Sequence, residues 1–223
     1  CGRPVSSSTV ASLKPMVSIR RVSPRQAKIE GRAVEQEFGS PPPDAPPPSP
    51  DPRDINGSYQ QVEEKDDGSV WTKDIVQQCA PELEIGMRGY PEKIVQTPGR
   101  ITFIQEFNHI VRRIYLDEDF PAQITPSYTG HSVGRWEGDV LVVRTRGVKG
   151  VRVAADPRFA TVREIEERIT KQPDGTVRNR AKIFGADAAG KELVAERSAT
   201  LLWRPDIRLF EYICEDGAGV EFK

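Results

Sequence analysis

The chain alternates apolar and polar residues in short runs from about residue 54 onward, and turn signals interrupt these runs every ten or so positions. Alternation with a period of two is typical of half-buried β-strands. Within 192–203 one face is apolar apart from a single arginine, and the opposite face is largely polar. The first face holds Leu193, Ala195, Arg197, Ala199, Leu201 and Trp203, and the second holds Glu192, Glu196, Ser198 and Thr200.

A preceding run shows the same alternation with a more highly charged polar face. Ile165 and Ile169 share one side of this predicted strand. Glu164, Glu166 and Arg168 share the other side. The charged side either faces solvent or lines a polar barrel interior, and we expect it to face solvent.

Turn pairs such as Pro98-Gly99 and Asp174-Gly175 separate the runs, and pairs of this kind between β-rich segments indicate hairpins. The predicted strands are EKIVQT, ITFIQEF, IVRRIYL, HSVGRW, DVLVVRT, REIEERITK, TVRNRAKIF, ELVAERSATLLWR and RLFEYICE. Eight or nine short strands with little helix predict an all-β barrel or sandwich. We favour an antiparallel barrel of lipocalin-like size.

Residues 1–53 differ in composition and are predicted to form an extended arm that precedes a barrel domain at 54–223. Eight prolines lie within 40–52. They favour polyproline II, a stiff spacer of about 3 Å per residue. The hydrophobic content of the whole chain, 37%, is low for a globular protein, and the arm accounts for much of that deficit.

Cys1 is followed by Gly2 and small polar residues, with no initiator methionine. This start is similar to that of a mature bacterial lipoprotein, whose N-terminal thiol is acylated after signal-peptide removal. A fragment boundary is the alternative. Stable anchoring takes more than one acyl chain, and a triacylated cysteine supplies them. We therefore expect a membrane-anchored periplasmic protein, and Gly2 in place of aspartate slightly favours the outer membrane.

A basic stretch follows the predicted anchor. Cations close to a membrane gain about 1 kcal/mol each from anionic headgroups. The stretch binds such headgroups, binds an acidic partner, or is a solvated tail, and we expect residues 13–52 to contact a membrane protein complex. The candidate partner-binding residues are Arg20, Arg21, Arg25, Lys28 and Arg32.

Cys79 and Cys214 are the two thiols that remain if Cys1 carries lipid. Thiol pairs tend to close in the oxidising compartments of exported proteins. We therefore predict a Cys79–Cys214 disulfide, with two separate buried thiols as the alternative. A loop of this length contributes about 4–5 kcal/mol in the chain-entropy model.

Charge and motifs argue against several functional classes. A net charge of −1 gives no overall attraction for nucleic acid. No apolar run reaches the ~18 residues of a membrane-spanning helix. The chain has 2 histidines and lacks CxxC, HExxH, GxGxxG and Walker motifs. We therefore expect no metal site and no cofactor.

Residues 130–134 (GHSVG) match the G-x-S-x-G nucleophile elbow of serine hydrolases. That elbow needs a strand before it, a helix after it and a general base downstream. Here a turn at Glu137-Gly138 and another predicted strand follow, and no histidine comes after His131. The motif therefore indicates a hairpin and not a hydrolase site.

The candidate catalytic residues are polar side chains in the middle of the chain. A histidine, a carboxylate and an arginine that converge inside a barrel could transfer protons on a small apolar substrate. The alternative is that the arginines pair with acids at a barrel rim and the histidines form hydrogen bonds in turns. The residues considered are His109, Glu106, Arg112 and His131.

Several segments carry a family resemblance, namely QQCAPE, YPEKIVQTPGRITFIQEFNHIVRRIYLD, GHSVGRWEGDVLVV and LFEYICED. On these segments the chain resembles a large group of exported bacterial proteins over most of 77–223. The resemblance implies export and a single β-rich domain, and it assigns no catalytic residue. The chain departs from the group in its long arm and after Val143, where Arg144-Thr145-Arg146 stands in place of an acidic stretch.

These features predict a lipid-anchored periplasmic barrel that acts as a binding module or as an accessory subunit of a membrane protein complex. One alternative is a small-molecule barrel enzyme, such as a lyase, isomerase or cyclase, with a deep pocket lined by His109, Glu106 and Arg112. The other is a carrier with an apolar pocket. The barrel interior distinguishes the three.

Overall fold

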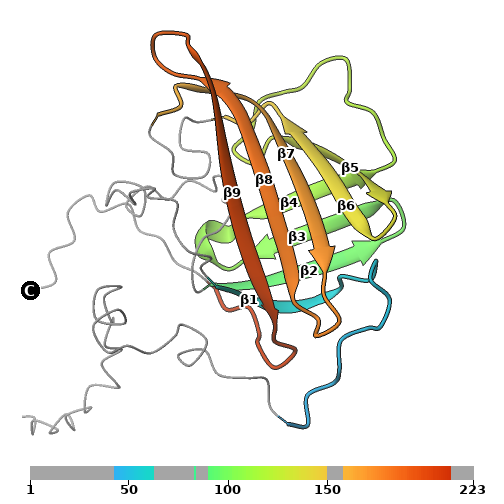
Figure 1. The fold of residues 1–223 in the computed structure, drawn as a ribbon. Coiled ribbons are helices and arrows are strands. Elements are labelled where there is room, and N and C mark those ends of the chain that lie inside the picture. Colours follow the sequence, from blue (N-terminus) through green and yellow to red (C-terminus); the bar gives the residue numbers. More distant parts are fainter. Residues whose placement is uncertain (1–42, 63–82, 84–89, 150–157, 212–223) are drawn as a thin grey trace, which may run out of the picture. The chain divides into compact units, whose positions relative to one another are not determined.

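The computed structural model describes residues 43–62, 83, 90–149 and 158–211. Nine strands form a closed barrel in the order β1 to β9 (Figure 1). Apart from one short 3₁₀ turn, η1 (Phe107–His109), these residues form no helix. The predicted all-β barrel is confirmed. Its strands are β1 (Gly57–Val62), β2 (Pro91–Thr97), β3 (Arg100–Gln105), β4 (Val111–Leu116), β5 (His131–Glu137), β6 (Val140–Arg146), β7 (Thr161–Lys171), β8 (Val177–Ala186) and β9 (Glu192–Trp203).

The chain divides into two units, residues 1–33 and residues 34–223, and the barrel belongs to the second. Acylation, the disulfide and binding by the basic arm stay predictions, because their residues lie outside the described part of the chain. These residues are Cys1, Cys79, Cys214, Arg20, Arg21, Arg25, Lys28 and Arg32.

Strands β4 and β5 are parallel, whereas the other neighbouring strands are antiparallel. Parallel strands cannot be joined by a tight hairpin and need a crossover connection. Residues 117–130 make that connection, and the bridge between Ser127 and Val148 attaches it to the segment after β6. The sequence predicted only antiparallel strands, because alternation of residue types carries no information about the direction of a neighbouring strand.

Strand β1 closes the barrel by pairing with both β2 and β9. The sequence did not identify β1, because Gln60 and Gln61 stand where apolar residues are expected, yet both are buried, at 4% and 5% exposure. The predicted strand RLFEYICE is not found in its described part, since residues 208–211 form no strand. Its remaining residues lie outside the described ranges.

The proline-rich segment lies against the end of the barrel from Pro46 onward. The Lys171 ammonium, at the end of β7, donates to the carbonyl oxygens of Ser49 (2.7 Å), Asp51 (3.2 Å) and Asp54 (2.5 Å). The indole Nε1 of Trp203 donates to the carbonyl of Pro46 at 3.2 Å. We call residues 46–54 the strap. The strap is therefore fixed to the barrel, and its Pro48 lies against Gly175 in the β7–β8 turn.

Inward-facing side chains form two apolar clusters in the barrel. On β7 the first cluster includes Ile169 and the second includes Ile165, with Glu167 between them in the alternation. On β8 Asn179 takes the same intermediate position. A polar layer therefore separates the clusters. The first contains Ile55, Tyr59, Ile94, Ile101, Phe103, Ile114, Leu141, Val143, Ile169, Val177 and Leu201, and the second contains Leu83, Phe159, Ile165, Ala181, Ile183, Ala195 and Ala199.

Candidate functional site

The polar layer is built from one inward-facing residue on each of the strands β1 to β8. Each of these residues occupies a position that the alternation of its strand assigns to the interior. Their side chains meet inside the barrel although they are far apart in sequence. The interior polar layer consists of Gln61, Glu92, Gln105, Arg112, Ser132, Thr145, Glu167 and Asn179.

Arg112 of β4 and Glu167 of β7 form a two-point ion pair at the centre of this layer. The Nη1 atom donates to Oε1 at 2.9 Å, and Nη2 donates to Oε2. Exposure of the two side chains is 6% and 0%. Because removing one partner leaves the other charge buried and unpaired, such a pair is costly to break.

Neighbouring polar groups complete the hydrogen bonding of this ion pair. Arg112 also donates from Nε to the Ser132 hydroxyl (3.1 Å) and from Nη2 to the Thr145 hydroxyl (2.7 Å). The Asn179 amide donates to Oε1 of Glu167 at 2.7 Å. The Ser132 and Thr145 hydroxyl oxygens are 2.8 Å apart. Four of the five guanidinium N–H donors are therefore engaged by the protein itself, which leaves little of this group for a substrate.

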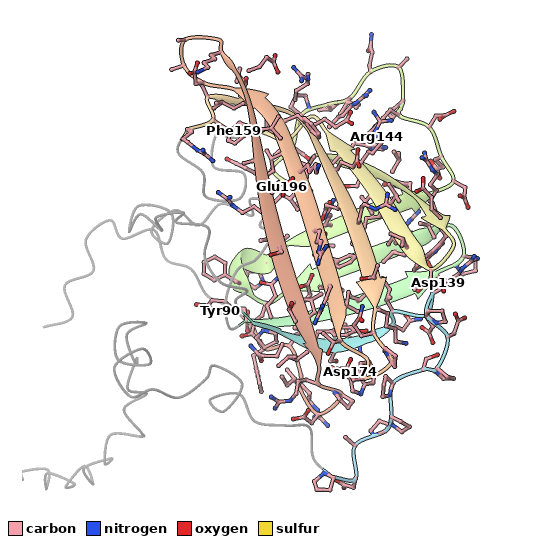
Figure 2. The ribbon with its side chains drawn as sticks, in the orientation of Figure 1. Tyr90, Asp139, Arg144, Phe159, Asp174 and Glu196 are labelled. Carbon is pink, nitrogen blue, oxygen red and sulfur yellow. The ribbon has the colours of Figure 1, made fainter. Side chains whose placement is uncertain are left out.

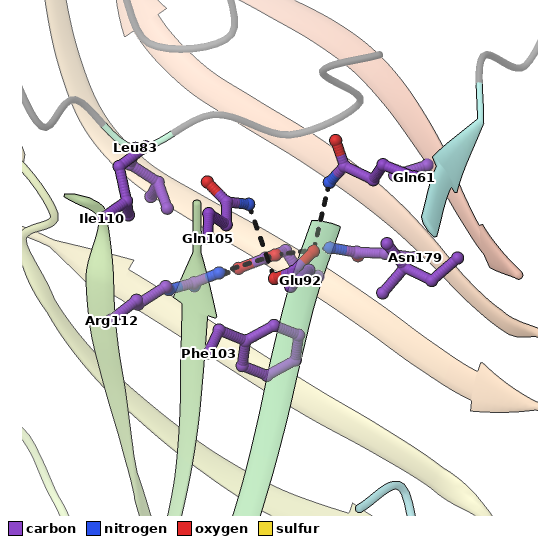
Figure 3. Close-up of a pocket in the computed structure, with 11 residues that line it drawn as sticks. Gln61, Leu83, Glu92, Phe103, Gln105, Ile110, Arg112 and Asn179 are labelled. Carbon is purple, nitrogen blue, oxygen red and sulfur yellow. Dashed lines mark hydrogen bonds and ion pairs between the residues drawn. The ribbon is translucent and has the colours of Figure 1, made fainter. Parts of the chain in front are cut away.

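Glu92 of β2 is the second buried carboxyl group of the layer. It accepts hydrogen bonds from Gln61 at 3.3 Å and from Gln105 at 3.4 Å (Figure 3). Burial raises the pKa of Glu92 to about 7, with a further increase from the Glu167 charge, while the hydrogen bonds and Arg112 act in the opposite direction. The group therefore gains or loses a proton near neutral pH inside the barrel.

A small cavity adjoins Glu92, with about 20 Å³ of space for the centre of a water molecule. About 10–15 Å³ by this measure holds one water. The Oδ1 atom of Asn179, which lines the cavity, is buried and has no hydrogen-bond partner among the described residues. The cavity therefore fits one ordered water, and it is too small for a metabolite. Its lining includes Gln61, Leu83, Glu92, Phe103, Gln105, Ile110, Arg112, Glu167 and Asn179.

The four predicted catalytic residues do not converge. Arg112 lies inside the barrel, whereas His131 lies on its outer side, with its ring stacked on Tyr115 at a centroid distance of 5.0 Å. His109 is exposed in η1 with a φ of 52°. Glu106 accepts a hydrogen bond from the backbone N–H of Phe210 at 2.8 Å. This arrangement gives them no shared reaction site.

The GHSVG segment has a structural explanation in its strand. Ser132 is buried near the start of β5 and accepts a hydrogen bond from Arg112, so it is not presented as a nucleophile. Gly134 faces the interior, where an added Cβ would lie 2.8 Å from Cγ2 of Ile114. Gly130 has a φ of +65°, and an added Cβ would lie 2.8 Å from the carbonyl oxygen of Arg146. The β5–β6 hairpin predicted after this segment is present.

Of the interior polar layer, sequence reasoning had only Arg112 among its site candidates. It missed the other seven residues, namely Gln61, Glu92, Gln105, Ser132, Thr145, Glu167 and Asn179. The sequence did contain a usable signal. Glu167 lies two residues from both Ile165 and Ile169, and it therefore shares their face of the strand. A carboxylate on the apolar side of a strand is placed in the interior by the pleat. The neighbouring charges Glu164, Glu166 and Arg168 do alternate to the outer side, as we expected.

A second hollow lies on the outside of β6, β7 and β8, with a volume of about 500 Å³. Most of its charges are already paired, since Arg146 contacts Glu164 at 2.5 Å and Arg163 contacts Glu192 at 2.8 Å. Glu166 also lines the hollow and stands between Arg144 and Lys182 in the strand register. This hollow therefore offers few unpaired charges to a ligand.

No protein-family model matches the chain, and no curated protein matches its sequence significantly. Among the described residues, no three His, Cys, Asp or Glu side chains are grouped so that they could hold a metal ion. The same residues contain no helix long and apolar enough to cross a membrane. The site is therefore interpreted from its own geometry.

Proposed function

We propose that this protein is a lipid-anchored periplasmic barrel that acts through its outer surface, as a binding module or accessory subunit at a bacterial membrane. The described residues fill the barrel interior, and this observation supports a role for the outer surface. Two apolar clusters and an ion-paired polar layer occupy the barrel, and the cavity between them fits about one water.

The two alternative functions have less support. An enzyme of the predicted kind needs His109, Glu106 and Arg112 to share a pocket, but Arg112 is engaged by Glu167 inside the barrel and His109 is exposed. A carrier of apolar ligands needs a cavity of several hundred Å³. The cavity at Glu92 is far smaller than that.

The strap supports the anchored arrangement. An anchor at Cys1 would reach the barrel through the proline-rich segment, whose carbonyl groups are held by Lys171. The barrel would then be attached to the membrane through one defined end, and the rest of its outer surface would be accessible to a partner.

The test has two steps. Mass spectrometry of the N-terminal peptide from the native protein is expected to show an acylated Cys1, and a free thiol there would rule out the anchor. Co-purification from gently solubilised membranes is then compared between the full chain and a chain lacking residues 2–42, which keeps the strap. We expect partner proteins to be lost with the arm. Two forms that both behave as monomers would contradict an accessory role.

A further inference from the structure

On the outer faces of β6 to β9, one row of side chains, here called the upper row, alternates in charge from strand to strand, and the neighbouring rows do not. In the upper row, register places Arg144 beside Glu166, Glu166 beside Lys182, and Lys182 beside Glu196. Figure 2 labels Arg144 and Glu196, the two ends of this row. Signs alternate across four strands, and Lys182 contacts Glu196 at 3.3 Å. Opposite charges placed directly across strands stabilise a sheet.

The next rows toward the β7–β8 turn break this pattern. Arg168 of β7 lies directly opposite Arg180 of β8, and Arg178 lies opposite Thr170. On the β9 side, Arg180 faces Ser198 and Arg178 faces Thr200. No carboxylate therefore stands beside Arg178 or Arg180 in these rows. Like charges directly opposite one another are destabilising.

The side chains of these arginines face outward. Exposed Arg178 and Arg180 alternate along β8 with buried Val177 and Asn179. Arg168 is half exposed and makes a long 3.4 Å contact with Glu137, while no ion pair to Arg178 or Arg180 is found among the described residues. We call Arg168, Arg178 and Arg180 the basic face. Arg178 and Arg180 break the local rule of opposite charges with no carboxylate beside them, which points to an external anion.

We propose that the basic face is the surface with which the barrel docks on an anionic lipid bilayer. Arginine binds phosphate groups well, because its planar guanidinium offers several N–H donors. The position of the basic face agrees with a bilayer as its binding partner. Lys171 holds the strap next to the turn that leads to Arg178. An anchored arm would bring this end of the barrel to the membrane, so the choice of a bilayer rests on the proposed lipid anchor.

The test uses the full-length chain with Cys1→Ser, so that no acyl group contributes, and vesicles of phosphatidylglycerol or of phosphatidylcholine. Binding is expected with phosphatidylglycerol only and should weaken with salt. Replacing both exposed arginines (R178Q together with R180Q) is expected to weaken partitioning by about 10- to 30-fold. The matched control, R163Q together with K182Q, removes the same charge from paired positions and should change partitioning by less than about 3-fold.

Arg180→Glu gives an independent readout. It turns the like-charged pair with Arg168 into an opposite-charged pair, so thermal stability should hold or rise while vesicle binding falls. If this variant unfolds at a lower temperature and also binds vesicles less, the loss of binding results from misfolding. That outcome would contradict the proposal.

Other outcomes separate this proposal from the proposed function. The basic arm also attracts anionic vesicles, so all variants are repeated with Arg20, Arg21, Arg25, Lys28 and Arg32 changed to glutamine. Equal effects of the test and control pairs would overturn the basic face as a bilayer surface, even if Cys1 proves to be acylated. If R178Q together with R180Q leaves vesicle binding unchanged but loses a co-purified membrane protein, the basic face binds an acidic protein partner. This result would overturn the proposal that the face docks on a bilayer.

Discussion

The guanidinium of Arg112 and the carboxylate of Glu167 join opposite sides of the barrel interior. The two residues belong to β4 and β7, which are separated in the barrel by β5 and β6. Two hydrogen bonds connect them, and three further contacts come from Ser132, Thr145 and Asn179. The pair therefore fixes how the two halves of the barrel pack against each other.

Breaking this pair from one side is expected to be strongly destabilising. Glu167→Leu leaves the Arg112 charge buried and should lower the free energy of unfolding by about 3–5 kcal/mol. Arg112→Met leaves the opposite charge and should have a similar cost. The double variant removes both charges and should recover most of the loss, since apolar replacements of a buried pair are often neutral. Urea denaturation of the three variants measures these differences.

An exposed ion pair on the same barrel provides the comparison. Arg163→Gln breaks the contact between Arg163 and Glu192, whose two side chains are 61% and 67% exposed, and should lower the free energy of unfolding far less than either single variant of the buried pair. A double variant as unstable as either single variant would show that the layer contributes through its shape and not through charge pairing.

Glu92 should make stability depend on pH. Its pKa is raised by burial from an ordinary value near 4.5 to about 7, so the folded protein retains a proton that the unfolded chain has lost. This contribution is fully present below the unfolded pKa and is lost as pH rises toward 7. The expected loss is about 3 kcal/mol between these limits.

Comparison with a variant isolates this effect from other carboxyl groups. Glu164 acts in the opposite sense, because hydrogen bonds from Arg144 and Arg146 outweigh burial and lower its pKa. Glu92→Gln should abolish the loss of unfolding free energy between pH 4.5 and 8. Glu118→Gln, at an exposed position, should leave that loss unchanged. Parallel stability curves for the parent and Glu92→Gln over this range would contradict the assignment.

Gly175 should be sensitive to substitution because of the strap. Its φ is +86°, and an added Cβ would lie 2.6 Å from Cβ of Pro48. Gly190 has a similar φ of +80° but nothing within 4 Å of the added atom. Gly190→Ala should therefore cost only the backbone strain of about 1–2 kcal/mol. Gly175→Ala should cost more and should expose residues 46–54 to proteolysis, and equal costs would mean that the strap contributes no stability.

The predicted Cys79–Cys214 disulfide is tested by mass. Protein isolated under oxidising conditions should gain the mass of two hydrogens on reduction, and its unfolding midpoint should fall in reductant. Alkylation of both thiols without reduction would show that the cysteines are separate. Cys79→Ser and Cys214→Ser should then each have little effect on the midpoint.

Much of the barrel could be predicted from the sequence because strand alternation and turn chemistry are local. The segment VRNRAKIFGA shows this, since its period of two alone places Val177 and Ala181 inside and Arg178 outside. Strand β1 escaped prediction because buried glutamines replace its apolar residues. Most of the candidate site escaped as well. Residue type suggested four candidates, and of these only Arg112 lies in the interior polar layer, whereas His109 and His131 do not.

The sequence by itself determined that β2 to β9 become strands and which face of each is apolar, and it favoured a barrel of eight or nine strands. Those properties depend on neighbours two residues apart. Only the tertiary structure decided that β4 and β5 are parallel, that Arg112 meets Glu167, and that Arg168 stands opposite Arg180. These contacts join residues 12 to 55 positions apart. They depend on strand order and register, which alternation does not encode.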